Sequence, residues 1–257
     1  MAVRQFSRQN RTGRLQHSTV SLRSRWMQHL WDDADTAFRA SILAALAVDP
    51  TAELLDVGCE DGAWTERLRR RLGIAASQVH GLEIVEPQAR RARARGFDVR
   101  TGDLDDHWPF DTGSIDIVHA NQVIEHVARL DHFVLETKRI LRSGGLAVVC
   151  TENLASWHNV AALLVGYQPF SATNISSRRP IGNPLALHAG EPVEEESLQH
   201  VHVITLKALR DIFLAHGFGI EADWGSGYHP FGGRAAAGLA SIDPNHAHFV
   251  AVVARRA

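Results

Sequence analysis

The stretch LLDVGCEDGAW, Leu54 to Trp64, decides the fold, because it reads as a buried strand, a glycine turn and the start of a helix. A turn that binds pyrophosphate would carry glycine at positions 58, 60 and 63 of this chain. The chain has Gly58, but Glu60 stands at the middle position, where bare backbone must approach the phosphates. Because a carboxylate would repel a dianion, we expect this loop to bind no nucleotide, or one without phosphates.

Strands and helices alternate around this turn. Apolar spacing and turn residues predict strands at 53–57, 78–83, 97–101, 115–119 and 146–151, and helices at 26–47, 62–72, 86–95 and 130–141. A short helix at about 156–165, a helix from Thr205 to Gly217 and strands at 219–224 and 248–254 are expected to follow. The alternation predicts an α/β fold, a Rossmann-like doubly wound sheet that is mostly parallel and has helices on both faces.

Residues 23–257 are expected to form a single domain with two irregular segments. A stretch rich in Pro, Gly, Ser and Asn predicts a lid over about 154–204, and a second stretch predicts a variable loop over about 225–244. Residues 1–22 are expected to form a flexible basic arm, because the first 25 residues hold six arginines and no acid. A phosphate-seeking or targeting tail is the alternative role for this arm.

The composition excludes several classes of protein. A net charge of −2, from 27 basic and 29 acidic residues, provides no global field for nucleic acid or an anionic membrane. A secretory segment and a long apolar run are both missing, so a cytoplasmic location is the default expectation. The two cysteines, Cys59 and Cys150, are too few for a disulfide framework. Fifteen histidines are many for 257 residues, and eight of them follow residue 152.

Polar residues gather at the carboxyl ends of the predicted strands, where open α/β sheets bind ligands. They are Asp56, Glu83, Asp103, Asn121, Glu152 and Asn153. An acid at the position of Glu83 typically accepts hydrogen bonds from both hydroxyls of a ribose. The acidic surroundings favour a cationic ligand over a phosphate. S-adenosylmethionine meets both demands, because it joins an adenosine to a sulfonium and an ammonium group.

The chain resembles the class I S-adenosylmethionine-dependent methyltransferases from Glu53 to Asn153. The resemblance is carried, in order, by the segments LLDVGCEDG, GLEIVEP, GDLDDHWPFDTGSIDIVHANQVIEHV and ETKRILRSGGLAVVCTEN. Each motif alone is weak, but their order and spacing are specific. The resemblance implies a methyltransferase with S-adenosylmethionine as cofactor, an antiparallel C-terminal strand and an inserted lid. Glu60 departs from the family pattern, since many relatives have glycine there.

The same resemblance implies roles for individual residues. The cofactor loop would be formed by Asp56, Gly58, Cys59, Glu60 and Gly62. The ribose would be held by Glu83, the adenine ring would contact Ile84, Asp103 and Leu104, and the floor near the methyl group would be Asn121 and Gln122.

Alternatives remain for single acids. Asp56 could hydrogen-bond its own turn, and Asp103 could be a turn residue. Glu83 could instead pair with an arginine of the helix that follows it, namely Arg90, Arg91 or Arg93.

A hydroxyl acceptor needs a base, and histidine titrates in the suitable range. The candidates are His126, in a Glu-His pair after the fourth strand, His158, and the pair His200 and His202. His200 and His202 are two residues apart, so in an extended segment they would share one face and form a base with its orienting partner, or bind a metal jointly. Structural roles are the alternative for all of them. Mg²⁺ is left open, with oxygen ligands from Glu125, Glu152, Glu191 and Glu194–Glu196.

The second half of the chain is expected to choose the acceptor. ENLASWHNVAALLVGYQPF and ASIDPNHAHFVAVVARR are similar to bacterial sugar and polysaccharide O-methyltransferases, including those of mycobacterial methylmannose polysaccharides, which implies a sugar hydroxyl as acceptor. The alternatives are methylation of another small metabolite on oxygen, nitrogen or carbon, a non-catalytic module that binds adenosylmethionine or a partner, and a nicotinamide dehydrogenase. A homodimer is also left open.

Overall fold

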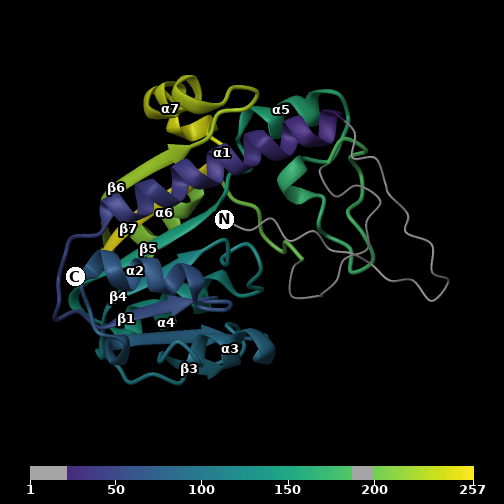
Figure 1. The fold of residues 1–257 in the computed structure, drawn as a ribbon. Coiled ribbons are helices and arrows are strands. Elements are labelled where there is room, and N and C mark those ends of the chain that lie inside the picture. The colour runs from purple at the N-terminus through teal and green to yellow at the C-terminus, as the bar shows by residue number, and fades with distance from the viewer. Residues whose placement is uncertain (1–21, 187–198) are drawn as a thin grey trace.

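The computed structural model describes residues 22–186 and 199–257 (Figure 1). The predicted basic arm lies outside these residues apart from Leu22, and so does the middle of the predicted lid, including its four acids. The described helices are α1 (Leu22–Ala45), α2 (Ala63–Leu72), α3 (Glu86–Arg93), α4 (Leu130–Ile140), α5 (Trp157–Leu164), α6 (Leu206–Ala215) and α7 (Gly233–Ile242). Short 3-10 helices are η1 (Ala76–Gln78), η2 (Phe170–Ala172) and η4 (Pro244–His246). Within these residues, no helix combines the length and apolarity that a bilayer crossing needs.

Seven strands form one sheet in the order β3-β2-β1-β4-β5-β7-β6. They are β1 (Leu54–Val57), β2 (Val79–Glu83), β3 (Asp98–Thr101), β4 (Ile115–Asn121), β5 (Leu141–Glu152), β6 (Phe218–Ser226) and β7 (Phe249–Arg256). The first five strands pair in parallel, whereas β7 is antiparallel to both β5 and β6. This confirms the predicted α/β class. The strand order reverses between β1 and β4, which is where open α/β sheets bind ligands.

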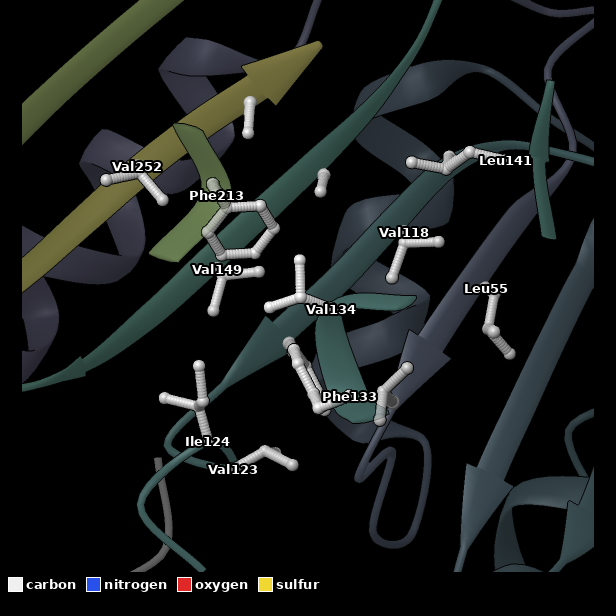
Figure 2. Packing of buried hydrophobic residues seen from close by; sticks show 14 of the residues in the cluster. Leu55, Val118, Val123, Ile124, Phe133, Val134, Leu141, Val149, Phe213 and Val252 are labelled. Atoms are coloured by element: carbon white, nitrogen blue, oxygen red, sulfur yellow. The ribbon is translucent and has the colours of Figure 1, made fainter. Parts of the chain in front are cut away.

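Helices cover both faces of the sheet. Buried side chains of α1, α2 and α3 pack with Leu54, Val148 and Ala251 on one face. On the other face, α4 and α6 contribute Phe133, Val134 and Phe213, which Figure 2 shows beside Val149 and Val252 of the sheet. Burying each such side chain contributes roughly 1.5–3 kcal/mol.

The loop after β4 is anchored in the same core. Val123 and Ile124 follow the end of β4 and lie next to Phe133 of α4 in Figure 2. Val123 is 7% exposed and Ile124 is 1% exposed. The polar residues on either side of them are thereby held at the carboxyl edge of the sheet.

The chain between residues 225 and 244 differs from the variable loop expected there. β6 continues to Ser226, and α7 occupies Gly233–Ile242. The sequence GGRAAAGLASI offers few large apolar side chains, so its helical periodicity is weak. The helix is held by small residues, since Ala236 and Ala240 pack against Tyr228 and Ala247.

Substituting Gly58 by alanine is expected to destabilise the fold more than the same change at Gly113. Both glycines adopt a left-handed conformation, with φ of 69° and 66°, which costs an alanine about 1–2 kcal/mol. A Cβ on Gly58 would also lie 2.5 Å from Cγ2 of Val123, whereas one on Gly113 would meet nothing within 4 Å. We expect Gly58→Ala to lose a further 1–3 kcal/mol, roughly, in urea unfolding. Equal losses in the two variants would show that the contact with Val123 does not matter.

Candidate functional site

The loop after β1 is held from the side by Glu83, at the end of β2. One carboxylate oxygen of Glu83 accepts a hydrogen bond from the backbone N–H of Glu60 at 2.9 Å, and the other accepts from Val85 at 2.8 Å. The alternative ion pair with α3 is not seen among the described residues, since Arg90 and Arg93 lie against Glu86 instead. Each Glu83 oxygen keeps a second lone pair, so the carboxylate can still accept from a ligand.

Glu60 occupies the position of the missing glycine in a conformation that glycine would favour. Its φ is 48°, in the left-handed region that non-glycine residues rarely adopt. The hydrogen bond from its N–H to Glu83 holds this conformation. Burial of part of the side chain raises the pKa of Glu60, while Arg39 of α1 opposes this rise. Glu60 therefore adopts a left-handed backbone conformation without being glycine. Its carboxylate lies close enough to Arg39 for the positive charge of Arg39 to lower its pKa.

The side chain of Asp56 connects β1 with α2 and β4. Its two oxygens are engaged by Thr65, whose hydroxyl donates at 2.5 Å, and by Nδ1 of His119 at 2.7 Å. The indole N–H of Trp64 donates to Nε2 of His119 at 3.4 Å, so the His119 proton resides on Nδ1. Asp56 is 2% exposed, and we expect it to shape the cofactor loop through these contacts rather than to touch the cofactor.

His119 was not among the residues that the sequence singled out. It lies in the middle of β4 directly opposite Asp56 of β1 in the parallel register. The available signal was a histidine in an otherwise apolar strand, next to a strand that carries a buried acid. Its partner could be named only once the register of the two strands was known.

The predicted adenine contacts occupy two different environments. Ile84 is 49% exposed and presents an apolar surface beside Glu83. Oδ1 of Asp103 accepts from the backbone N–H of Asp105 at 2.9 Å, as a turn residue would. Leu104 packs against the core. Of these three residues, Ile84 has the surface that a flat ring needs, and the roles of Asp103 and Leu104 remain predictions.

Two amide side chains at the end of β4 carry unsatisfied atoms. Oδ1 of Asn121 and Nε2 of Gln122 are buried and have no hydrogen-bond partner in the described part of the chain. Gln122 is also left-handed, with φ of 57°. An unpaired buried polar group costs roughly 1–3 kcal/mol, and such atoms are frequent where a ligand completes the site. A polar ligand with both donors and acceptors fits this edge of the sheet.

A cluster of Glu125, His126 and His200, hereafter the Glu125 cluster, lies just beyond these amides. One side-chain nitrogen or oxygen from each residue lies within 4.8 Å of the others. Nδ1 of His126 donates to the carbonyl of Gln199 at 2.9 Å, and Nδ1 of His200 donates to that of Ser171 at 2.6 Å. These bonds leave the Nε2 lone pair of each ring available to accept a proton.

The carboxyl group of Glu125 is fully enclosed. Oε2 accepts a hydrogen bond from Thr151 at 2.9 Å, and Oε1 has no partner among the described residues. Burial raises the pKa of Glu125 to about 7, and nearby His200 opposes this rise. Burial lowers the pKa of His126 to about 4, so this ring is neutral near pH 7. The cluster therefore combines neutral imidazole with a carboxyl group that titrates near neutrality.

Because the pKa of Glu125 is raised on folding, wild-type protein should lose stability relative to Glu125→Gln as the pH rises. Below 4.5, the ordinary pKa of a glutamate, the carboxyl is protonated in both the folded and the unfolded state. Between 4.5 and about 7 the folded state binds more protons, so the free energy of unfolding falls with pH through this window. Urea unfolding at pH 5, 6, 7 and 8 measures the difference between the two proteins.

Glu136→Gln provides the control for this difference. Burial raises the pKa of Glu136, but Arg139 and the Trp108 N–H outweigh that effect and bring it to about 2. The contribution of Glu136 to the free energy of unfolding is fully present above pH 4.5 and is lost only as the pH falls toward about 2. The difference in free energy of unfolding between wild type and Glu136→Gln should therefore stay constant from pH 5 to pH 8. A flat difference for Glu125→Gln as well would contradict the raised pKa.

The structure separates the other predicted histidines. It places His200 against His126, with ring centroids 4.9 Å apart, rather than pairing His200 with His202. Nε2 of His202 points to the carbonyl of Ala128 at 3.2 Å, because residues 200 to 203 do not form the regular extended segment that would align the two rings. His158 belongs to a second group, with His229 and His248.

The Mg²⁺ ion that the sequence left open has no oxygen-rich site among the described residues. The two groups in this part of the chain that could hold a metal are the Glu125 cluster, with one carboxylate, and the three histidines just named. Mg²⁺ prefers oxygen ligands and retained water, so neither group suits it. The lid acids that the sequence offered lie outside the described residues.

Comparisons with known proteins agree with the fold. A methyltransferase domain family matches residues 25–222. A probable S-adenosylmethionine-dependent methyltransferase of Mycolicibacterium smegmatis is 35% identical over 103 residues, which cover 39% of this chain and 38% of that protein. A ubiquinone biosynthesis O-methyltransferase of Caulobacter vibrioides is 32% identical over 103 residues, covering 39% of this chain and 40% of that protein. The chain thus spans about two fifths of the length of these relatives.

Solved structures share the fold at low identity. An S-adenosylmethionine-dependent methyltransferase from Mesorhizobium loti superposes with a TM-score of 0.55 and 19% identity, covering 88% of this chain and 100% of that one. The fold and the family agree with the prediction of S-adenosylmethionine as cofactor. Because the family model spans most of the sequence, from before β1 into β6, the chain belongs to the methyltransferase domain family.

Proposed function

We propose that this protein transfers the methyl group of S-adenosylmethionine to a hydroxyl group of a small-molecule acceptor. The Glu125 cluster carries the proposal, because it brings the imidazole of His200 against that of His126, whose loop also carries the unsatisfied amides of Asn121 and Gln122. A hydroxyl is a poor nucleophile at neutral pH and needs such a base. Methylation on carbon or nitrogen would make less use of it.

The residues at the carboxyl edge fit the adenosine part of the cofactor. Glu83 would accept hydrogen bonds from the ribose hydroxyls through its free lone pairs, and Ile84 would cover a face of the adenine. The amide groups of Asn121 and Gln122 would form hydrogen bonds to polar groups of the cofactor, which would supply the partners that these amides lack. When bound, S-adenosylmethionine supplies a methyl group activated by its positive sulfur.

Within the Glu125 cluster, we assign the base to His200. Nδ1 of His200 keeps its proton, since it donates to Ser171, so Nε2 takes the proton of the acceptor hydroxyl. The imidazolium that forms gains a negative neighbour in Glu125, whose pKa already responds to His200. The ring of His126 packs edge-to-face on that of His200, and its lowered pKa keeps it neutral near pH 7. Held in this arrangement, the acceptor oxygen, relieved of its proton by His200, would be presented to the methyl group that S-adenosylmethionine supplies.

A sugar hydroxyl is the finer form of this proposal. Exposed rings on the second half of the chain support it, because sugars stack on flat apolar faces: Tyr167 is 37% exposed and Phe231 is 49% exposed. The names of similar proteins point to other acceptors, in ubiquinone biosynthesis and in 27-O-demethylrifamycin SV. The cytoplasmic location stays a prediction, and a homodimer stays open.

The test is incubation of the full chain with methyl-labelled S-adenosylmethionine and separate panels of mannosides, glucosides, phenols, catechols and amines. Labelled ether products support a hydroxyl acceptor, and labelled glycosides alone support the sugar form. Transfer only to amines or to carbon would overturn the proposal. Calorimetry with S-adenosylhomocysteine runs beside it, since binding without transfer to any acceptor would favour a non-catalytic module.

A further inference from the structure

Three histidines meet in the second half of the chain, away from the Glu125 cluster in sequence. His158 lies in the first turn of α5, His229 in the loop between β6 and α7, and His248 directly before β7. Their ring centroids are 4.8 Å apart for His158 and His229, 4.6 Å for His158 and His248, and 4.5 Å for His229 and His248. We call these residues the histidine cluster.

The histidine cluster is poorly explained as ordinary core. All six ring nitrogens are buried, and within the described residues none has a partner at normal hydrogen-bond geometry, although the backbone of Leu30 lies near enough to His229 to act on its pKa. A neutral imidazole needs one acceptor for its N–H and one donor for its lone pair, and leaving them unpaired away from water is costly. Three apolar side chains of similar size would avoid this cost. Three such rings in contact therefore point to a ligand that imidazole nitrogens bind together.

The rings are in the protonation state that ligands require. Burial lowers the pKa of all three rings, and it brings that of His158 to about 3. The rings are thus neutral at physiological pH, each with one lone pair. The backbone of Leu30 faces His229 and acts on its pKa in the opposite direction to burial. A backbone carbonyl beside a ring is the usual partner that orients a ligating histidine.

We propose that His158, His229 and His248 bind one divalent transition-metal ion of the Zn²⁺ class. Imidazole nitrogens suit such ions, whereas Mg²⁺ and Ca²⁺ prefer oxygen. One nitrogen from each ring lies within 4.8 Å of the others. Tetrahedral bonds of about 2.0–2.1 Å to Zn²⁺ bring ligand nitrogens to roughly 3.3 Å from one another, so modest rotations of the rings complete the site. Three protein ligands leave a fourth position for water or a substrate atom.

The bound ion would connect three separate segments in the second half of the chain. The backbone carbonyl of His248 accepts from the N–H of Asn153 at 2.9 Å, which connects the cluster to the end of β5. The side chain of Asn153 in turn donates to the carbonyls of Asn245 and Ala247, both at 2.8 Å. Metal binding would therefore stabilise α5, the loop after β6 and the start of β7 against the sheet edge that carries the methyl-transfer site.

The experiment uses the full chain without a histidine tag, treated with a chelator and then titrated with Co²⁺. We expect the strong visible absorption of four-coordinate Co²⁺ to saturate at one equivalent and to vanish when Zn²⁺ is added. Zn²⁺ at a hundred times its dissociation constant should also raise Tm by roughly 5–10 °C. Both readouts are independent of methyl transfer.

Variants separate this cluster from other histidines. His229→Gln and His248→Gln should each lose the absorption and the Tm shift. His246→Gln should keep both, because His246 neighbours the cluster in sequence but bonds to Asp243 and stacks on Trp157. His200→Gln should keep them too, since it alters only the Glu125 cluster.

Three results would overturn the assignment. They are no Co²⁺ absorption and no Tm shift in the wild-type chain, loss of both in His200→Gln, and retention of both in His229→Gln and His248→Gln. Circular dichroism of the chelated proteins shows which variants are folded, and the wild-type titration decides the matter even if a variant is not.

Discussion

Replacing His200 by alanine is expected to lower kcat for methyl transfer to a hydroxyl acceptor by about 10²–10⁴-fold, the usual worth of a positioned base. The ring would be lost together with its Nε2 lone pair, while the residues proposed to bind the cofactor, at the ends of β2 and β4, remain. Affinity for S-adenosylhomocysteine should therefore change little. Initial rates with labelled cofactor and calorimetry measure the two quantities on the same preparation.

The pH profile distinguishes a base from a merely structural histidine. Wild-type kcat should rise as the pH increases through about 7, because ionised Glu125 stabilises the imidazolium that His200 forms, and the residual activity of His200→Ala should lack this rise. Glu125→Gln keeps the shape of the cluster but removes the charge that stabilises the imidazolium, so we expect a smaller loss, of about 10–100-fold, and no rise of kcat near pH 7.

Two other histidines serve as comparisons. His202→Ala should retain most activity, because its ring bonds to the Ala128 carbonyl instead of facing the cluster. His132→Ala, on α4 with its ring bonded to the carbonyl of Asp106, controls for the loss of any imidazole. Near-full turnover by His200→Ala, or an equal loss in His202→Ala, would contradict the assigned base.

The sequence predicted the parts of the fold that local patterns determine. Leu54–Val57 is uniformly apolar apart from Asp56 and bounded by Gly58, so the strand and turn follow from side-chain chemistry alone. Glu83 could be placed at a strand end in the same way. The α7 helix was missed because alanine and glycine give no strong period, and its packing against Tyr228 is set by the tertiary structure.

Contacts between distant residues could not be predicted in this way. The ring of His126 contacts that of His200, which is 74 residues later in the sequence and lies in a segment without helix or strand. His229 and His248 belong to no recognisable sequence motif. They lie beside His158 because β7 runs antiparallel to β5, so that the start of β7 is next to the end of β5. The spacing of residues in the sequence predicts contacts within one helix or strand. The contacts in these two clusters depend instead on which strands are neighbours in the sheet.

Glu83→Ala is expected to weaken the binding of S-adenosylhomocysteine by roughly 10²-fold or more. Hydrogen bonds to a charged group contribute about 1.5–3 kcal/mol each, and Glu83 would lose two to the ribose. It would also release the N–H of Glu60, which is held in a left-handed conformation by this carboxylate. Calorimetry measures the affinity, with Glu86→Ala as control, because Glu86 bonds to Arg93 and Thr101 on the far side of α3.

The ribose contact and the support of the loop can be separated with a ligand that lacks the 2′-hydroxyl. If Glu83 binds the ribose, the wild-type protein should prefer S-adenosylhomocysteine over its 2′-deoxy form by about 10-fold or more, and Glu83→Ala should lose this preference. If Glu83 only holds the loop, both proteins should show the same preference, and the variant should bind both ligands weakly. Unchanged affinity in Glu83→Ala would contradict both roles. A lost preference would mean that the carboxylate which allows Glu60 to replace glycine also reads the sugar of the cofactor.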